Sequence, residues 1–84
     1  MIPNHIKESL AAYVKEGRPT GGFLYHVLTN DLFGAILRAD VGNIVALRDI
    51  CKYVCNEMPS NCWGSPKIVE AWLKRREKER KKKL

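Results

Sequence analysis

The amino-acid sequence predicts an all-α fold: a compact bundle of four to five short helices in a single domain, with a charged helical extension at the C-terminus. Apolar residues recur at spacings of three and four along most of the chain, and capping residues, prolines and glycines separate these stretches. No run of alternating β-branched residues and no hairpin signal occurs in the sequence. At 84 residues the chain has room for one small domain with a marginal core, so a homo-oligomer is also considered.

The first helix is expected from Pro3 to about Glu16. Proline suits the first turn of a helix, and Ile6, Leu10 and Tyr13 recur on one helical face. Gly17 is expected to end the helix in the left-handed conformation, which glycine adopts at little cost.

The stretch from Arg18 to Leu28 changes from turn chemistry to apolar helical spacing. Because a residue before proline disfavours helix, Thr20 is expected as the N-cap of a second helix, with Gly21 and Gly22 in its first turn. The apolar side chains of this helix are Phe23, Leu24, Val27 and Leu28.

A second break is expected at residues 29–30, where Asn30 or Asp31 can cap a further short stretch of helix. The pattern is compatible with two short helices or with one bent helix. The apolar side chains after the break are Leu32, Phe33, Ile36 and Leu37.

Two longer helices complete the prediction. Asp40 is expected to cap the first of them, and Pro59 ends it. Its apolar face is predicted from spacings of three and four to consist of Ile44, Leu47, Cys51, Val54 and Met58. After a loop at 59–64, Ser65 and Pro66 are expected to start the last helix as its N-cap and first residue. Its apolar side chains are Ile68, Val69, Trp72 and Leu73.

The net charge of +6 is concentrated at the C-terminus. Residues 74–83 hold eight basic and two acidic side chains, whereas residues 1–73 hold seven of each. We therefore divide the chain into a helical domain, 1–73, and a basic tail, 74–84. The longest stretch without charge has twelve residues, too few to span a bilayer, and the N-terminal residues lack the pattern of a secretory signal. A cytoplasmic location is expected.

The glycine-rich helix start is a candidate ligand site. The first N–H groups of a helix have no partner within it, and Gly21 and Gly22 carry no side chain to block approach, so phosphate or carboxylate can be held there. Arg18 is near in sequence and adds a guanidinium. The alternative is that the glycines only allow a tight turn or close packing against another helix.

Trp63 is a second candidate, because a tryptophan in a loop can stack on a flat ring. Such stacking on a base contributes about 1–3 kcal/mol, and Tyr53 and Asn56 are near enough in sequence to supply hydrogen bonds. The alternative is that Trp63 folds back over the core and covers the corner between two helices.

Three cysteines, Cys51, Cys55 and Cys62, could join His5 or His26 as zinc ligands. Their spacing is not that of the paired cysteine knuckles in zinc ribbons. We interpret the cysteines as reduced thiols that act as small buried apolar residues.

A catalytic role for His26 needs an orienting carboxylate, which Asp31 or Asp49 could supply, and a nucleophile such as Ser60, Ser65 or Cys62. Nothing in the spacing requires this arrangement. A structural histidine is the simpler interpretation, and we expect no catalytic residue, no metal and no cofactor.

The basic tail can bind phosphate backbones without reading sequence. The alternative is a solvated end that aids solubility. The residues of the nucleic-acid hypothesis are Lys74, Arg75, Arg76, Lys78, Arg80, Lys81, Lys82 and Lys83.

The chain resembles a group of short, largely uncharacterised proteins of tailed bacteriophages and prophages, from Ile2 to about Leu73. The resemblance implies a phage origin and expression inside a bacterial cell. It rests on Tyr13-Val14, Gly17, Pro19, Gly21-Gly22-Phe23-Leu24, Val27-Leu28, Asn30-Asp31-Leu32, Arg38-Ala39-Asp40, Asn43, Ala46-Leu47, Asn56, Pro59, Trp63-Gly64-Ser65 and Trp72.

The polar residues of this pattern are numerous for so small a core. The whole set is Asn30, Asp31, Arg38, Asp40, Asn43 and Asn56. Those members that neither cap a helix nor form an ion pair are expected to line a polar pocket.

These observations lead to one functional hypothesis and two alternatives. The leading hypothesis is a non-enzymatic phage binding protein, a counter-defence factor that sequesters a phosphate-bearing cyclic nucleotide signal. The alternatives are a nucleic-acid-binding phage accessory protein that uses the tail and an inhibitor that docks an apolar face on a host protein. In the leading hypothesis the ligand-binding residues are Arg18, Thr20, Gly21, Gly22, Arg38, Tyr53, Asn56 and Trp63.

Overall fold

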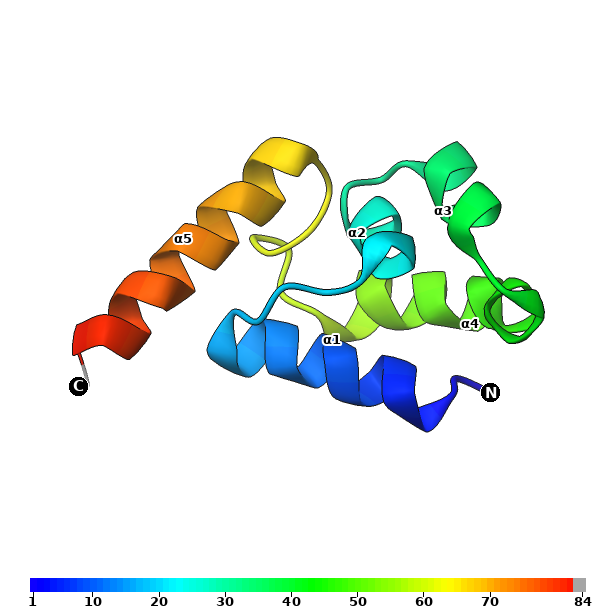
Figure 1. The fold of residues 1–84 in the computed structure, drawn as a ribbon, viewed down its shortest axis with the longest axis horizontal. Helices are drawn as coiled ribbons and strands as arrows, with labels where there is room; N and C mark the ends of the chain where they lie inside the picture. Colours follow the sequence, from blue (N-terminus) through cyan, green and yellow to red (C-terminus); the bar gives the residue numbers. More distant parts are fainter. Residues whose placement is uncertain (83–84) are drawn as a thin grey trace.

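The computed structural model describes residues 1–82, which form five α-helices and no strand (Figure 1). This confirms the all-α prediction, including the charged helical extension. The break at residues 29–31 separates two short helices, which resolves the choice between two helices and one bent helix. The elements are α1 (Asn4–Glu16), α2 (Gly22–Leu28), α3 (Leu32–Arg38), α4 (Val41–Glu57) and α5 (Pro66–Lys82).

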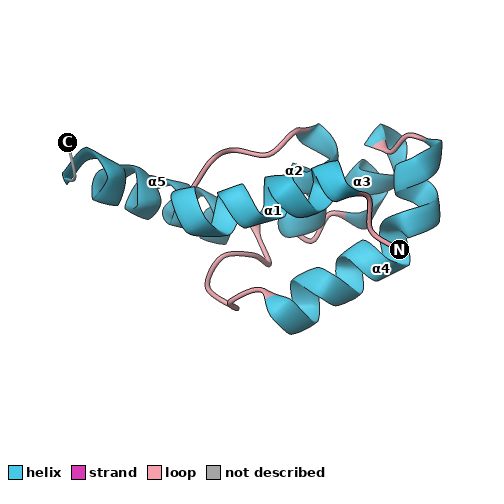
Figure 2. Cartoon of the chain, turned by 90° about the horizontal axis from the view of Figure 1, so that it is seen from below, coloured by secondary structure: helices cyan, strands magenta, loops and turns pink. Residues whose placement is uncertain are grey.

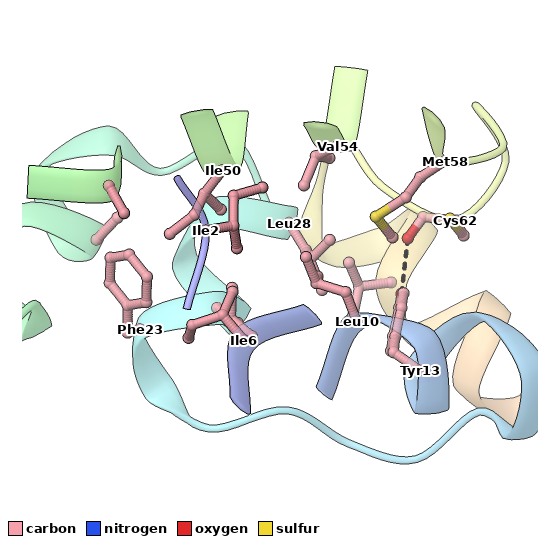
Figure 3. Close-up of a cluster of buried hydrophobic side chains, with 14 of the residues drawn as sticks. Ile2, Ile6, Leu10, Tyr13, Phe23, Leu28, Ile50, Val54, Met58 and Cys62 are labelled. Carbon is pink, nitrogen blue, oxygen red and sulfur yellow. Dashed lines mark hydrogen bonds between the residues drawn. The ribbon is translucent and has the colours of Figure 1, made fainter. Parts of the chain in front are cut away.

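The core lies between α1, α2 and α4, with the 59–64 loop closing one end (Figure 3). Leu10, Leu28 and Ile50 are completely buried and come from these three helices. Figures 1 and 2 show α5 at one end of the molecule and α3 with the start of α4 at the other. The long dimension of 40 Å, against 24 and 21 Å for the other two, reflects the projecting α5.

Tyr13 connects α1 to the loop that follows α4. Its hydroxyl donates to the main-chain carbonyl of Cys62 at 2.7 Å inside the core (Figure 3). The same loop is held from the other side, because the N–H of Gly64 donates to the carbonyl of Leu28 at 2.7 Å. A buried carbonyl without a partner is costly, so these two bonds fix the loop between α1 and the end of α2.

The end of α1 packs against α5 through a close backbone approach. Gly17 ends α1 with φ 70°, as predicted, and a Cβ at this position would overlap the side chain of Arg76. The guanidinium of Arg76 donates to the carbonyl of Lys15, and the indole N–H of Trp72 donates to the carbonyl of Tyr13 at 3.0 Å. Gly17 therefore serves both the helix end and the contact with α5.

Three predicted N-caps are confirmed by side-chain hydrogen bonds. Asp31 accepts from the N–H of Gly34 at 3.0 Å, and Asp40 accepts from the N–H of Asn43 at 2.7 Å. The Ser65 hydroxyl accepts from the N–H of Ile68 at 3.2 Å, with Pro66 as the first residue of α5.

Two other helix starts differ from the prediction by one residue. Pro3 is the N-cap of α1 and not a residue of its first turn. Gly21, not Thr20, is the N-cap of α2, and no side chain caps that helix. The reason is that Gly21 is extended, with ψ near 175°, so the helix begins only at Gly22 and the Thr20 hydroxyl lies too early to cap it.

The predicted apolar face of α4 was partly wrong over its first three turns: Leu47 is half-buried against the core as expected, but Ile44 and Cys51 are not. The buried residues there are Asn43, Ala46 and Ile50, whereas Ile44 and Cys51 are exposed. Both sets repeat at spacings of three and four, so the periodicity alone could not choose between them. The predicted and the observed faces agree again at Val54 and Met58, which are buried.

The basic tail continues α5 without interruption as far as Lys82, so the domain 1–73 and the tail share one helix. Lys83 lies outside the described residues. Between residues 1 and 82, no helix is long and apolar enough to cross a membrane.

Replacing Tyr13 with Phe should lower the free energy of unfolding by about 1–3 kcal/mol, because the buried Cys62 carbonyl loses its donor. Chemical denaturation monitored by circular dichroism measures this change. Tyr53→Phe is the matched control, since Tyr53 is only half buried, and it should stay within about 0.5 kcal/mol of the wild type. Equal effects of the two substitutions would contradict the structural role of the Tyr13 hydroxyl.

The same hydroxyl should make stability depend on alkaline pH. Burial, and to a lesser extent the nearby Cys62 thiol, raises the pKa of Tyr13 above its ordinary value of about 10. Above that pH the unfolded chain loses the Tyr13 proton while the folded chain keeps it, so the free energy of unfolding should fall as pH rises. Below that pH both states are protonated and the contribution is constant. The decline should be shallower in Tyr13→Phe, and an unchanged slope would contradict the assignment.

Candidate functional site

An open groove lies between α1, the start of α2 and α4, with a volume of about 350 Å³. This is near the lower limit of the volumes of small-molecule sites, roughly 300–1,000 Å³. The groove is lined by His5, Ile6, Ser9, Gly21, Gly22, Phe23, Leu24 and Asn43.

The glycines leave the groove open at the start of α2. A Cβ at Gly21 would meet no atom within 4 Å, so this position faces open space. A Cβ at Gly22 would lie 3.3 Å from Nη1 of Arg38, which reaches across from the end of α3. Both predicted ligand-binding glycines and one of the two predicted arginines, Arg38, therefore lie close together.

Backbone N–H groups are available at the same place. The first N–H groups of an α-helix have no carbonyl partner within the helix, and no side chain caps α2. Gly22, Phe23 and Leu24 form this first turn and all line the groove. Together with the Arg38 guanidinium they offer hydrogen-bond donors and one positive charge to a bound group.

Asn43, on α4, carries a hydrogen-bond acceptor, whereas the start of α2 and Arg38 carry donors. The residue is only 8% exposed, and its side-chain Oδ1 is buried without a hydrogen-bond partner. An unsatisfied buried acceptor costs about 1–3 kcal/mol, so a ligand hydroxyl or N–H that reached it would be favoured. Asn43 is one of the polar residues expected to line a pocket, and it is the one most clearly left without a partner.

Other polar residues of that set are used by the fold. Asp31 and Asp40 cap α3 and α4, as described for their hydrogen bonds to Gly34 and Asn43. His5 and Ser9 of α1 were not predicted as residues of this site. Their spacing of four places both on one face of α1, which was the available signal, but it could not show what that face meets.

Arg18 and Thr20 do not line the groove. Arg18 is exposed and pairs with Glu16, and its hydrogen bond holds the pKa of that carboxyl below its usual range. Thr20 is partly exposed in the connection between α1 and α2.

Trp63 lines a different groove of about 190 Å³, which shares no lining residue with the first. The side chain is half-buried against the core, in agreement with a corner-covering role, and its indole nitrogen is buried without a partner. Tyr53 also packs against the core, and Asn56 is exposed. The lining residues of this second groove are Val27, Asn30, Cys51, Val54, Cys55 and Trp63.

His26 and Asp31 form a pair that belongs to the α2–α3 junction. Nδ1 of His26 lies 2.8 Å from Oδ2 of Asp31, whose other oxygen caps Gly34. The Gly34 N–H first, and then His26, lower the pKa of the Asp31 carboxyl. A Cβ at Gly34 would overlap both side chains, so the pair is packed over the glycine. These contacts give His26 and Asp31 a structural role.

The cysteines differ from the expectation. Cys62 is buried, and its thiol donates to the carbonyl of Pro59 at 3.1 Å, but Cys51 and Cys55 are exposed on α4. The exposure follows from the rotation of α4 that buries Ile50. Burial raises the pKa of the Cys62 thiol, and partial desolvation by neighbouring side chains raises the pKa of the Cys51 thiol although that residue is exposed. Across residues 1–82, no three histidine, cysteine or acidic side chains are grouped to hold a metal ion.

The basic residues of α5 divide into two groups. Arg76 packs against α1 and over the Trp72 ring at 5.6 Å, and it pairs with Glu79, so it supports the fold. Arg75 and Lys81 also pair with glutamates along the helix. A shallow surface on the exposed side of α5 is lined by Ala71, Lys74, Arg75, Lys78, Glu79 and Lys82.

Comparison of the chain with protein-family models, with curated proteins and with solved structures gave no match.

Substituting Ala for Gly34 tests the packing of the His26–Asp31 pair. The added methyl group overlaps both side chains and should lower the free energy of unfolding by about 1–3 kcal/mol. Gly42→Ala is the matched control, because its Cβ would meet only Asp40 Oδ1, at 3.6 Å. In the first turn of α4 this change should stabilise the protein by up to about 1 kcal/mol. Thermal unfolding of both variants decides the question, and a neutral Gly34→Ala would refute the packing described.

Proposed function

We propose that the chain is a non-enzymatic binding protein that takes a phosphate-bearing nucleotide in the groove between α1, α2 and α4. The observation that carries the proposal is that Asn43, whose buried Oδ1 has no hydrogen-bond partner, lines the same groove as the uncapped start of α2. Arg38 stands beside Gly22 and adds a positive charge.

The proposed site has both hydrogen-bond donors and an acceptor, and a nucleotide has both the acceptors and the donors that would pair with them. Phosphate oxygens accept from the Arg38 guanidinium and from the N–H groups of the first turn of α2. A ribose hydroxyl or an exocyclic amine can donate to Asn43 Oδ1. Inorganic phosphate satisfies only the first of these, so it should bind more weakly than a nucleotide.

The wall formed by α1 contributes the remaining contacts. His5 is exposed on the groove and offers a flat ring, and Ser9 one turn later offers a hydroxyl. In this proposal His5 provides the stacking surface, while Trp63, Tyr53 and Asn56 lie outside the groove. The site therefore consists of His5, Ser9, Gly21, Gly22, Arg38 and Asn43.

The biological role that we propose is counter-defence in a phage-infected bacterial cell. The resemblance to tailed-bacteriophage proteins supports it, because a small phage protein without catalytic groups can act by removing a cyclic nucleotide signal from solution. A sequestering protein needs a site that holds the ligand and no group that transforms it. In the proposed site the groove supplies the first turn of α2 and Asn43, and the cation is Arg38, which does not line the groove but lies beside Gly22.

Isothermal titration calorimetry with inorganic phosphate, cyclic dinucleotides and cyclic ADP-ribose isomers tests the proposal. At least one nucleotide should bind, and Arg38→Gln should weaken it by roughly 10- to 100-fold, as expected for loss of a charged hydrogen-bond partner. Gly21→Leu should block binding without unfolding the protein, since position 21 faces open space. Arg48→Gln, on the exposed side of α4, is the control. Absence of heat with every nucleotide would reject the proposal, as would wild-type affinity in both variants.

A second candidate function is nucleic-acid binding through α5. It is favoured by one observation: Lys74, Arg75, Lys78 and Lys82 lie along one exposed stripe of a helix that projects from the body (Figure 1). Arg75, Lys78 and Lys82 follow Lys74 by one, four and eight residues. These cations therefore lie along the helix, where they can follow a phosphate backbone.

Salt-dependent binding of duplex DNA and of RNA tests this second candidate. Combined Lys74→Gln, Lys78→Gln and Lys82→Gln substitutions should weaken binding and reduce the slope of log K against log salt by about 0.9 for each lost phosphate contact. Lys7→Gln with Lys67→Gln is the control for loss of charge elsewhere. Unchanged affinity in the α5 variant would reject the tail as the binding element. Arg76 is kept, because its loss would also disturb the contact of α1 with α5.

A further inference from the structure

Seven large apolar side chains are exposed at the end of the molecule away from α5. We call this surface the apolar face; its members are Leu32, Phe33, Ile36, Leu37, Val41, Ile44 and Val45. Four of them, Phe33, Leu37, Val41 and Val45, expose 80–85% of their surface. Scattered exposed apolar residues are ordinary, but a concentration of this size on one small protein marks an interaction site.

The apolar face is contributed by two helices that follow each other in the chain. Only Ala39 and Asp40 separate α3 from α4, and Leu32 of α3 lines a small hollow together with Leu47 of α4. Ile36 and Ile44 are about half exposed, and each directly precedes a more exposed apolar residue of its helix, Leu37 in α3 and Val45 in α4. Figure 1 shows α3 and the start of α4 together at one end of the fold.

The burial of α3 is incomplete within a single chain. Ala35 is its one buried residue, although four of its seven residues are large and apolar. A helix of seven residues is not stable by itself and depends on packing of its apolar side chains. The four large apolar side chains of α3 therefore remain 43–85% exposed in the described part of the chain.

The apolar face carries little charge, which disfavours nucleic acid and anionic membranes as its partner. Between residues 32 and 45 the only charged side chains are Arg38 and Asp40, so the face is neutral. Nucleic acid and anionic membranes are recognised by clustered cations, which here lie on α5 at the opposite end (Figure 2). Two copies that meet through their apolar faces bring neutral surfaces together and keep their basic helices apart.

The size of the face also fits a second copy. We estimate the apolar surface of these seven side chains at roughly 500 Å². The estimate uses the area per side chain that accounts for its free energy of transfer out of water. With a polar rim this approaches the roughly 800 Å² that each partner contributes to a standard interface. A two-fold axis through the face would let the same patch serve both chains.

We propose that the apolar face of α3 and α4 is the interface of a homodimer with two-fold symmetry. The second copy covers Phe33, Leu37, Val41 and Val45, and the two α5 helices point away from the interface. This proposal uses none of the residues that line the nucleotide groove, which lies on the other side of α4, where Asn43 is buried. The one residue near both is Arg38, at the end of α3.

Sedimentation and light scattering of the full chain test the interface. The wild type should have twice the chain mass of 9.6 kDa, and Leu37→Lys and Val45→Lys, each made separately on a different helix, should shift the mass towards one chain. Both side chains are exposed in the monomer, so circular dichroism should show unchanged helix content. Ala71→Lys adds the same charge on exposed α5 and should remain dimeric.

Two results would overturn the dimer. One is a wild-type chain that is monomeric at all concentrations, whether or not it binds a host protein or lipid vesicles. The other is a dimer that persists in both Leu37→Lys and Val45→Lys, because it would have to use another surface. Nucleotide titration of the monomeric variants separates this outcome from failure of the groove proposal, since the groove should bind in either state.

Discussion

The hydrogen bond from the buried Tyr13 hydroxyl to the Cys62 carbonyl is the constraint on which the arrangement of the other elements depends. It holds the 59–64 loop against α1, and the Gly64 N–H then holds the end of α2 at the Leu28 carbonyl. The position of α2 in turn sets the start of that helix opposite α1, where the groove opens. A polar contact inside the core thus contributes to the geometry of a surface groove that other elements form.

The two proposed sites both arise from the orientation of α4. The helix turns Asn43 towards the core and Ile44 and Val45 towards solvent, which reverses the order expected from polarity. One side of the helix therefore gains a buried amide with an unpaired oxygen, and the other gains part of an exposed apolar face. Departures from the binary pattern of a core are expected where a protein binds something, because the ligand or partner supplies the missing contact.

Sequence reasoning predicted the local features well and the tertiary ones less well. The caps at Asp31, Asp40 and Ser65 and the left-handed Gly17 depend on a few neighbouring residues, so they could be read from the chain. The face of α4 could not, because Asn43-Ala46-Ile50 and Ile44-Leu47-Cys51 have the same spacing and only packing against α1 and α2 selects one. For the site, Gly21, Gly22 and Arg38 were predicted and lie together, but the meeting with His5 and Ser9 of α1 depends on contacts between distant segments. Trp63 was assigned to the same site from its residue type alone, and the loop places it in a separate groove.

The most direct test of the central claim is a nuclear magnetic resonance titration that follows each N–H group as a cyclic nucleotide is added. Binding in the groove should move the backbone signals of Gly21 and Gly22 and the side-chain amide of Asn43 most strongly, with the guanidinium of Arg38. The indole N–H of Trp63 and the amides of α5 should change little. Changes centred on Trp63 or on α5, with Gly21 and Gly22 unaffected, would contradict the account.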